Sequence, residues 1–241
     1  MEVISIEGIV VNTLKYGENS KIINVLTKDK GIIGIISKGC MSPKSKLRVI
    51  SNNFIYANFH LYYKEGKLGT LINADVINYF INIKSDIVKF SYMSYLVDLA
   101  KNVYKENNSS DIYDILINAL WKIEDNLNPK IITNIVEIKY LTYLGVGLNL
   151  DGCSVCGLTS VVSMSYNKGG YVCINHVGKD KVMDDVTLKL FKAYYYIDIS
   201  KISELNIKEK VVNEIDHFLN IYYKEYTGLY LKSKSFLDKI K

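Results

Sequence analysis

The sequence Cys153-Ser-Val-Cys156, followed by Cys173-Ile-Asn-His176, places two pairs of metal-binding side chains at a spacing typical of zinc sites. Residues 157–172 lie between the pairs. A tetrahedral zinc ion takes four sulfur or nitrogen ligands, and two tight turns of this kind supply them. Three of the chain's four cysteines fall inside this window, which argues against unrelated buried cysteines beside a surface histidine. We therefore predict a zinc site at Cys153, Cys156, Cys173 and His176.

The predicted zinc site is structural rather than catalytic. Four protein ligands close the coordination shell, whereas a catalytic zinc keeps one position open. No Glu or Asp directly adjoins the ligands to act as a general base for bound water. Gly157 follows the first pair and Gly169-Gly170 precedes the second, and the polar and aromatic insert between them is typical of a small β-hairpin. The metal is expected to staple a knuckle at residues 149–180.

Upstream of the knuckle, the first eighty residues have the pattern of a β-barrel. Runs of β-branched or alternating apolar residues are separated by turn-forming or polar segments, most of which contain glycine. The runs span residues 6–13, 21–27, 32–36, 54–63 and 68–76. This spacing predicts a small closed barrel of the OB type. An SH3-like barrel is the alternative, and the strand pattern does not separate the two.

From residue 85 onward the apolar period becomes helical. Ser85 is expected to cap the first helix, and a clean apolar stripe over 112–123 predicts the second. Asn128-Pro129 opens a third helix that stops at Gly145, because proline suits the first helical position. The third helix is apolar on several faces, so we place it at the centre of a bundle.

The segment after the knuckle predicts three more helices. The first begins at Asp184 or Asp185, the second covers about 208–226, and a short last one ends near Leu237. The expected fold class is therefore α+β multidomain, with an OB-type barrel at 1–80. A helical domain at 81–241 follows, and the zinc knuckle is inserted into it.

Composition limits the classes of protein that this chain can be. The formal net charge of +5 permits a nucleic-acid partner without requiring one. No apolar run approaches the length of about 18 residues that spans a bilayer, so no membrane association is expected. The N-terminus is acidic and lacks the basic segment of a signal peptide. Free thiols arranged for metal favour a reducing compartment, and we predict a cytoplasmic protein.

The motifs of common enzyme classes are missing from the sequence. It contains no GxxxxGK[ST], GxGxxG, GxSxG or HExxH pattern. His176 is assigned to the metal, and neither His60 nor His217 has an evident catalytic partner nearby in sequence. Cys40 has no assignable base that would activate it as a nucleophile. We expect a protein that is not an enzyme.

A basic loop between the third and fourth predicted strands is the second informative feature. Residues 38–48 carry four cations and no acid, and more lysines flank them. Such a run is often just a solvated loop, but OB barrels bind single strands with cations on phosphates and aromatic rings on bases. The predicted DNA-binding cations are Lys38, Lys44, Lys46, Arg48, Lys28 and Lys30. The candidate stacking residues are Tyr16, Tyr56, His60 and Tyr62.

Short motifs along nearly the whole chain carry a family resemblance. In order they are Glu7-Gly8-Ile9-Val10, Tyr16-Gly17-Glu18, Thr27-Lys28-Asp29-Lys30-Gly31, Lys38-Gly39, Lys44-Ser45-Lys46-Leu47-Arg48, Glu137-Ile138-Lys139-Tyr140-Leu141, Leu144-Gly145, Cys153-Ser-Val-Cys156-Gly157, Gly169-Gly170-Tyr171-Val172-Cys173 and Leu231-Lys232-Ser233. Each motif is short, and their order is what is specific. In that order the chain resembles the RecO family of bacterial recombination mediator proteins.

The resemblance implies a function in DNA repair and recombination after DNA damage. Family members bind single- and double-stranded DNA, anneal complementary strands and recognise the C-terminal tail of single-stranded DNA-binding protein. With RecR they help to load the RecA recombinase, so RecA is an indirect partner. The expected location is the bacterial cytoplasm, in association with the nucleoid. By position, Lys38, Lys44, Lys46 and Arg48 match the family's basic barrel segment and would contact DNA.

The chain departs from the family pattern in two places. Many zinc-bearing members have cysteine where this chain has His176, and imidazole is an acceptable fourth ligand. The basic segment uses lysine where relatives often use arginine, so bidentate phosphate contacts would be fewer. An acidic tail would need an apolar pocket with lysines nearby, and the last helix with Lys232, Lys234 and Phe236 is a candidate.

Two other classes of protein remain as alternatives. The first is a zinc-stapled protein-interaction module whose barrel binds no DNA. The second is an RNA-binding accessory factor, for which a preference for structured RNA over single-stranded DNA would be diagnostic.

Overall fold

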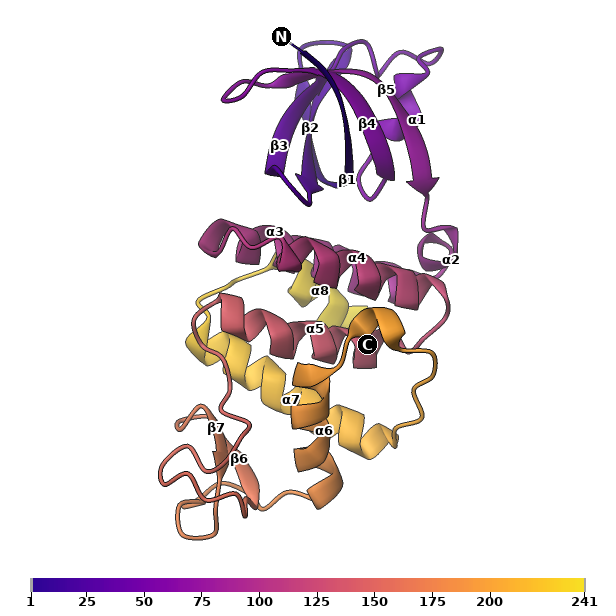
Figure 1. Cartoon of the computed structure of the whole chain (residues 1–241). Coiled ribbons are helices and arrows are strands. Elements are labelled where there is room, and N and C mark those ends of the chain that lie inside the picture. Colours follow the sequence, from indigo (N-terminus) through magenta and orange to yellow (C-terminus); the bar gives the residue numbers. More distant parts are fainter. Residues whose placement is uncertain (1, 241) are drawn as a thin grey trace. The chain divides into compact units, whose positions relative to one another are not determined.

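The computed structural model describes residues 2–240, which form two compact units (Figure 1). The first unit contains the residues up to Asp86 together with Asn108–Asp114. The second contains Ile87–Asn107 and the residues from Ile115 onward. Within residues 2–240, no helix has both the length and the apolar character needed to cross a membrane.

Among the described residues, five strands of the first unit close into a barrel in the order β1-β2-β3-β5-β4. The strands are β1 (Glu2–Tyr16), β2 (Ser20–Thr27), β3 (Gly31–Ser37), β4 (Tyr56–Tyr63) and β5 (Gly69–Asn78). The β3–β5 pair is parallel and the other pairs are antiparallel. This arrangement is that of an OB barrel, so the predicted fold is confirmed and the SH3-like alternative is excluded.

Strand β1 is longer than the predicted run and pairs with two neighbours. Its first half pairs with β4 over Glu2–Ile9, and its second half pairs with β2 over Gly8–Tyr16. The two pairings overlap at Gly8 and Ile9. At Gly8 an added Cβ would lie 2.5 Å from Val25 Cγ1 and 2.7 Å from the Leu26 carbonyl oxygen. Glycine is therefore required at the point where the strand passes from one partner to the other.

The barrel interior is filled by alternate side chains of the strands. On β4, Phe59 and Leu61 are fully buried, as the alternation predicted. They pack in one cluster with Val10, Ile23 and Ile35 from the three preceding strands. Between β3 and β4, the short helix α1 (Leu47–Ile50) replaces the end of the predicted polar loop and turns Ile50 into this core.

The second unit is a helical bundle. Its helices are α3 (Ile87–Glu106), the part of α4 (Asp111–Glu124) from Ile115 onward, α5 (Pro129–Tyr143), α6 (Asp185–Tyr196), the 3-10 helix η1 (Ile199–Lys201), α7 (Glu209–Tyr226) and α8 (Lys232–Ile240). Helix α5 packs against α3, α6 and α7, which confirms its predicted central position. Asn128 caps α5 by accepting from the backbone N–H groups of Lys130 and Ile131, with Pro129 at the first position.

The predicted cap at Ser85 is wrong. A short helix, α2 (Ile81–Lys84), precedes α3, and Ser85 is the residue that ends it. Its hydroxyl donates to the Asn82 carbonyl oxygen at 2.9 Å, and α3 begins only at Ile87. A serine hydroxyl can satisfy backbone groups at either end of a helix, so the residue type alone did not decide which end it served.

The predicted hairpin of the knuckle is confirmed. Strands β6 (Ser163–Ser165) and β7 (Gly170–Val172) pair antiparallel between the two ligand pairs. Asn149 forms an isolated parallel bridge to Gly170, which ties the entry of the knuckle to its second strand.

Candidate metal centre and basic surface

The four predicted metal ligands converge on one point. The Sγ atoms of Cys153, Cys156 and Cys173 and a ring nitrogen of His176 all lie within 4.8 Å of one another. The Cys156 and Cys173 sulfurs are 3.7 Å apart, and His176 Nδ1 lies 3.6 Å from the Cys153 sulfur and 3.3 Å from that of Cys173. Zn–S bonds of about 2.3 Å put ligand atoms roughly 3.8 Å apart in a tetrahedron. The cluster can therefore hold a tetrahedral metal ion, and its donor set is the soft one that zinc prefers.

Tight turns inside each pair aim the ligands. The Gly157 N–H donates to the Cys153 carbonyl oxygen at 2.8 Å, and the His176 N–H donates to that of Cys173 at 3.0 Å. Gly157 has a φ of +76°, a left-handed conformation that favours glycine at this turn. The spacing of three residues in each pair is thus a consequence of turn geometry.

Backbone dipoles also prepare the first thiol for metal binding. Burial raises the pKa of Cys153, but N–H groups of Cys173, Val155 and Cys156 surround the sulfur and lower the pKa to about 6. A thiolate, not a thiol, ligates a metal ion. The fold therefore favours the ligating form of this cysteine at neutral pH.

We expect Gly170→Ala to disrupt the knuckle. Gly170 has a φ of +153°, and an added Cβ would lie 2.3 Å from the Asn149 carbonyl oxygen, a backbone atom that cannot move aside alone. The bridge to Asn149 must open, so amide hydrogen exchange in residues 149–180 should accelerate by at least about tenfold. Gly178→Ala is the matched control. Gly178 also has a positive φ, of +57°, but no atom lies within 4 Å of an added Cβ, so this variant lacks the clash. Equal exchange in both variants would contradict this prediction.

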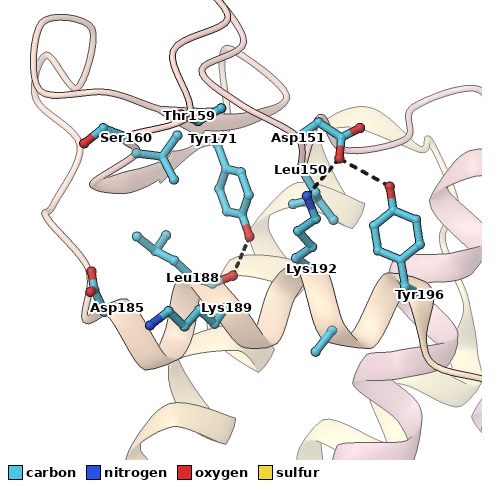
Figure 2. A pocket seen from close by; sticks show the side chains of 12 residues that line it. Leu150, Asp151, Thr159, Ser160, Tyr171, Asp185, Leu188, Lys189, Lys192 and Tyr196 are labelled. Atoms are coloured by element: carbon cyan, nitrogen blue, oxygen red, sulfur yellow. Dashed lines mark hydrogen bonds and ion pairs between the residues drawn. The ribbon is translucent and has the colours of Figure 1, made fainter.

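A pocket of about 710 Å³ lies between the knuckle and α6 (Figure 2). The Tyr171 hydroxyl donates to the Leu188 carbonyl oxygen across it. At its other side, Asp151 accepts from Lys192 Nζ at 3.0 Å and from the Tyr196 hydroxyl at 3.3 Å. The lower pKa of Asp151 follows from the Lys192 ammonium. These contacts fasten the knuckle to the helical bundle.

The predicted DNA-binding cations lie on the surface of the barrel unit. Lys38, Lys44, Lys46 and Arg48 are all exposed in the segment from β3 to α1. None of these four forms an ion pair with any described residue. Their charges are therefore available to an anionic partner.

The two flanking cations have other contacts. Lys28 Nζ lies 2.9 Å from Asp114 Oδ2 in the same compact unit, and this hydrogen bond raises the lysine pKa. Lys30 Nζ lies 5.1 Å from the centre of the Tyr63 ring. The Asp114 carboxylate thus compensates part of the positive charge of Lys28, whereas Lys30 has an aromatic ring as its neighbour.

The four candidate stacking residues differ in exposure. Tyr56 is buried and its hydroxyl donates to Glu7, so the prediction that it stacks on bases is wrong. Tyr56 lies on the same face of β4 as His60 and Tyr62, but at the start of the strand that face is buried. His60 Nε2 lies 2.7 Å from Asp75 Oδ2 in an exposed pair. Tyr16 and Tyr62 are exposed, at 50% and 46%, and remain accessible.

Two residues that the sequence did not single out join the basic surface. Lys21 and Asn52 line a pocket of about 290 Å³ with Cys40, Met41 and Arg48. Lys21 lies on a strand and Asn52 follows α1, so no local pattern linked them to the loop.

A further pocket, of about 500 Å³, lies beside the last helix. Its lining includes Lys232 and Lys234, as predicted for a pocket near this helix, together with Tyr95 and Tyr223. Phe236, the third residue of that prediction, does not line it and is 42% exposed. Phe236 is two residues from both Lys234 and Asp238, which line the pocket, so it lies on another face of α8 than those two residues. Lys232, the first residue of α8, also lines the pocket.

Comparison with known proteins gives the family. The profile described as Recombination protein O N terminal matches residues 1–80, and the one described as Recombination protein O C terminal matches residues 84–235. The protein named DNA repair protein RecO from Halalkalibacterium halodurans is 31% identical over 97% of this chain and 94% of its own length. Its namesake from Bacillus subtilis is 32% identical over 97% of this chain and 93% of its own length.

These matches cover both compact units of the chain. They agree with the OB order of the barrel, the helical second unit and the order of short motifs along the sequence. This chain belongs to the RecO family of DNA repair proteins.

Proposed function

We propose that this protein is a non-catalytic mediator of DNA repair and recombination that binds single- and double-stranded DNA and anneals complementary strands. The observation that carries the proposal is the exposed, unpaired set of cations at Lys38, Lys44, Lys46 and Arg48 on an OB barrel. Family membership supports it, because the curated relatives are named DNA repair proteins.

Annealing requires no reacting side chain in this mechanism. Phosphates of two approaching strands repel each other, and the cations of one surface replace the counterions that otherwise screen them. Two strands held at the same basic surface meet at a high local concentration, so pairing becomes faster. The exposed rings of Tyr16 and Tyr62 can stack on unpaired bases while the strand is held.

The variant Lys44→Glu/Lys46→Glu/Arg48→Glu tests this function. We expect its affinity for a fluorescent single-stranded oligonucleotide to fall by at least about a hundredfold at low salt, because three phosphate contacts become repulsive. Strand annealing, followed by fluorescence quenching of a labelled pair, should be lost in parallel. Binding of the wild type should fall steeply as salt rises.

The matched control is Lys105→Glu/Lys208→Glu/Lys210→Glu. It changes the net charge equally at exposed lysines of the helical unit that form no ion pair with a described residue. The proposal predicts that the DNA affinity of this control variant falls by at most a few-fold. If both triple variants bind DNA equally well, the barrel is not the DNA surface. If the wild type does not bind even at low salt, the DNA-binding function itself is wrong.

We also propose that the ion held at Cys153, Cys156, Cys173 and His176 is structural Zn²⁺. The support is the tetrahedral spacing of three thiols and one imidazole. The ion would hold the two turns of the knuckle together and leave no open position for chemistry. Residues 149–180 would then form a docking platform of fixed shape.

The proposed protein partners are RecR and the acidic C-terminal tail of single-stranded DNA-binding protein, with RecA acting downstream in the bacterial cytoplasm and nucleoid. For the tail, we favour the pocket beside α8, since lysines and aromatic rings line it. A fluorescent tail peptide should bind the wild type and bind Lys232→Glu more weakly, by about tenfold.

A zinc-stapled interaction module is the second candidate function. It is favoured by three exposed apolar side chains close to the metal ligands in sequence, Val155, Leu158 and Ile174, at 49%, 50% and 65% exposure. If disruption of the knuckle abolishes binding of a protein partner but leaves DNA binding intact, the interaction role and the DNA-binding role are separate.

A further inference from the structure

The small pocket at the edge of the barrel brings together three segments that are distant in sequence. Lys21 comes from the start of β2, Cys40 and Met41 from the loop after β3, and Arg48 and Asn52 from α1 and the turn that follows it. Its volume of about 290 Å³ is several times the ~30 Å³ of a water molecule, which is room for a phosphodiester group.

Hydrogen bonds hold these segments in place. The Ser51 hydroxyl donates to Ser37 Oγ at 2.7 Å, and both side chains are fully buried. This bond fixes the end of α1 against the end of β3, where Ser37 is also the register partner of Lys21. The Met41 N–H donates to the Asn19 carbonyl oxygen at 3.0 Å and closes the other side. The pocket is therefore preorganised.

The charges of the pocket favour an anion. Among the described residues that line it, two are cations and none is an acid. Lys21 Nζ donates to Asn52 Oδ1 at 3.1 Å, which orients the ammonium and leaves two of its three hydrogens for a ligand. The Arg48 guanidinium offers a planar fork that matches two oxygens of a phosphate.

A neighbouring cation, Lys15, adds to the positive charge at this edge of the barrel. Lys15 on β1 is the direct register partner of Lys21, and like charges opposite each other on paired strands repel. No described acid forms an ion pair with either lysine. A bound anion would remove this repulsion.

We infer that Lys21, Arg48 and Asn52 form a subsite for a single backbone phosphodiester of the bound DNA strand. Lys21 and Arg48 contact the phosphate oxygens, Asn52 positions the Lys21 ammonium, and Met41 lies beside the sugar. The inference rests on the proposed DNA-binding function and adds a defined phosphate position to it.

Because Arg48 is the only arginine in the sequence, its side chain can be observed alone. The full chain labelled with ¹⁵N-arginine gives one side-chain Nε–H signal in an NMR spectrum. We expect this signal to shift on addition of a short oligodeoxythymidine, and to shift equally with an abasic phosphodiester chain of the same length. The abasic chain separates phosphate contact from base stacking.

A matched pair of variants tests the pocket through its effect on DNA affinity. Asn52→Asp places a carboxylate beside Lys21, whereas Asn53→Asp adds the same charge at the next exposed residue, which does not line the pocket. We expect Asn52→Asp to weaken DNA binding about tenfold and to flatten the salt slope by about one. Asn53→Asp should weaken it by no more than about twofold.

Three results would overturn the subsite. The first is wild-type DNA binding, measured by fluorescence in the same sample, with an unmoved Arg48 signal; the proposed function would survive this result. The second is an Arg48 signal that shifts only with inorganic phosphate at high concentration and not with either oligomer. That result would mean that the pocket holds an adventitious ion only. The third is an equal effect of Asn52→Asp and Asn53→Asp. Absence of any DNA binding by the wild type would overturn both the subsite and the proposed function.

Discussion

Replacing Cys173 with serine is expected to abolish stoichiometric zinc binding and to unfold the knuckle. A serine hydroxyl stays protonated at neutral pH and does not replace a thiolate, so zinc affinity should fall by more than the ~100-fold typical of second-shell changes. The apolar cluster around the candidate ligands is small: its buried members are Cys153, Val172 and Cys173, and Val161 and Val177 pack against it. Two of the three buried members, Cys153 and Cys173, are candidate metal ligands themselves.

The measurements are zinc content after dialysis and hydrogen exchange over residues 149–180. Cys173→Ser should lose zinc and exchange rapidly there, while the barrel keeps its protection. Cys40→Ser is the control, because Cys40 is equally buried but lies in the barrel unit away from the ligand set. Full zinc occupancy in Cys173→Ser, or an equal loss in Cys40→Ser, would show that these ligands do not hold the metal.

Replacing Lys234 with methionine is expected to lower the free energy of unfolding by about 3–5 kcal/mol. Lys234 Nζ on α8 lies 3.5 Å from Glu137 Oε1 on α5, and the Glu137 side chain is only 1% exposed. The Tyr95 hydroxyl also donates to this oxygen at 2.6 Å, and burial keeps the pKa of Tyr95 well above its usual value, so the phenol stays protonated. Without Lys234, the buried Glu137 side chain loses its cationic partner on α8 and keeps one neutral donor, the Tyr95 hydroxyl.

The effect is measured as a urea unfolding curve for each variant. Lys232→Met removes an exposed lysine from the same helix and should change stability by no more than about 0.5 kcal/mol. The double variant Lys234→Met/Glu137→Gln should recover at least about half of the loss, because the amide carries no buried charge. A Lys234→Met protein as stable as Lys232→Met would mean that water or another cation already satisfies Glu137.

The cluster of four candidate metal ligands was predictable because its arrangement is mostly local. Each pair lies within one tight turn, and three residues of spacing suffice to bring two ligand atoms together. The hairpin that joins the pairs was also predictable from Gly169 and Gly170, at the start of β7. The sequence did not show how tightly Gly170 packs on Asn149, because that contact joins residues on either side of the first ligand pair.

The closed OB-type barrel was predictable from its five strands, but the residue pairs that close it were not. Alternation marked the strands, since side chains on a strand point alternately to the two faces. The parallel pairing of Ile35 with Gly69, which closes β3 on β5, joins residues far apart in the chain. The predicted domain limits of 1–80, 81–241 and 149–180 stay a prediction, although the compact units are close to them at the barrel boundary.

The sequence by itself determined the strand and helix types, the four candidate metal ligands and the basic segment, because each depends on a short-range pattern of residues. Only the tertiary structure decided that Glu137 and Lys234 meet in the core, that Tyr56 is covered, and that Lys21 joins Arg48 and Asn52. The physical reason is that a side chain's surroundings depend on which distant elements pack against it. A charged residue therefore looks the same in the sequence whether it will face water, an anion or a buried partner.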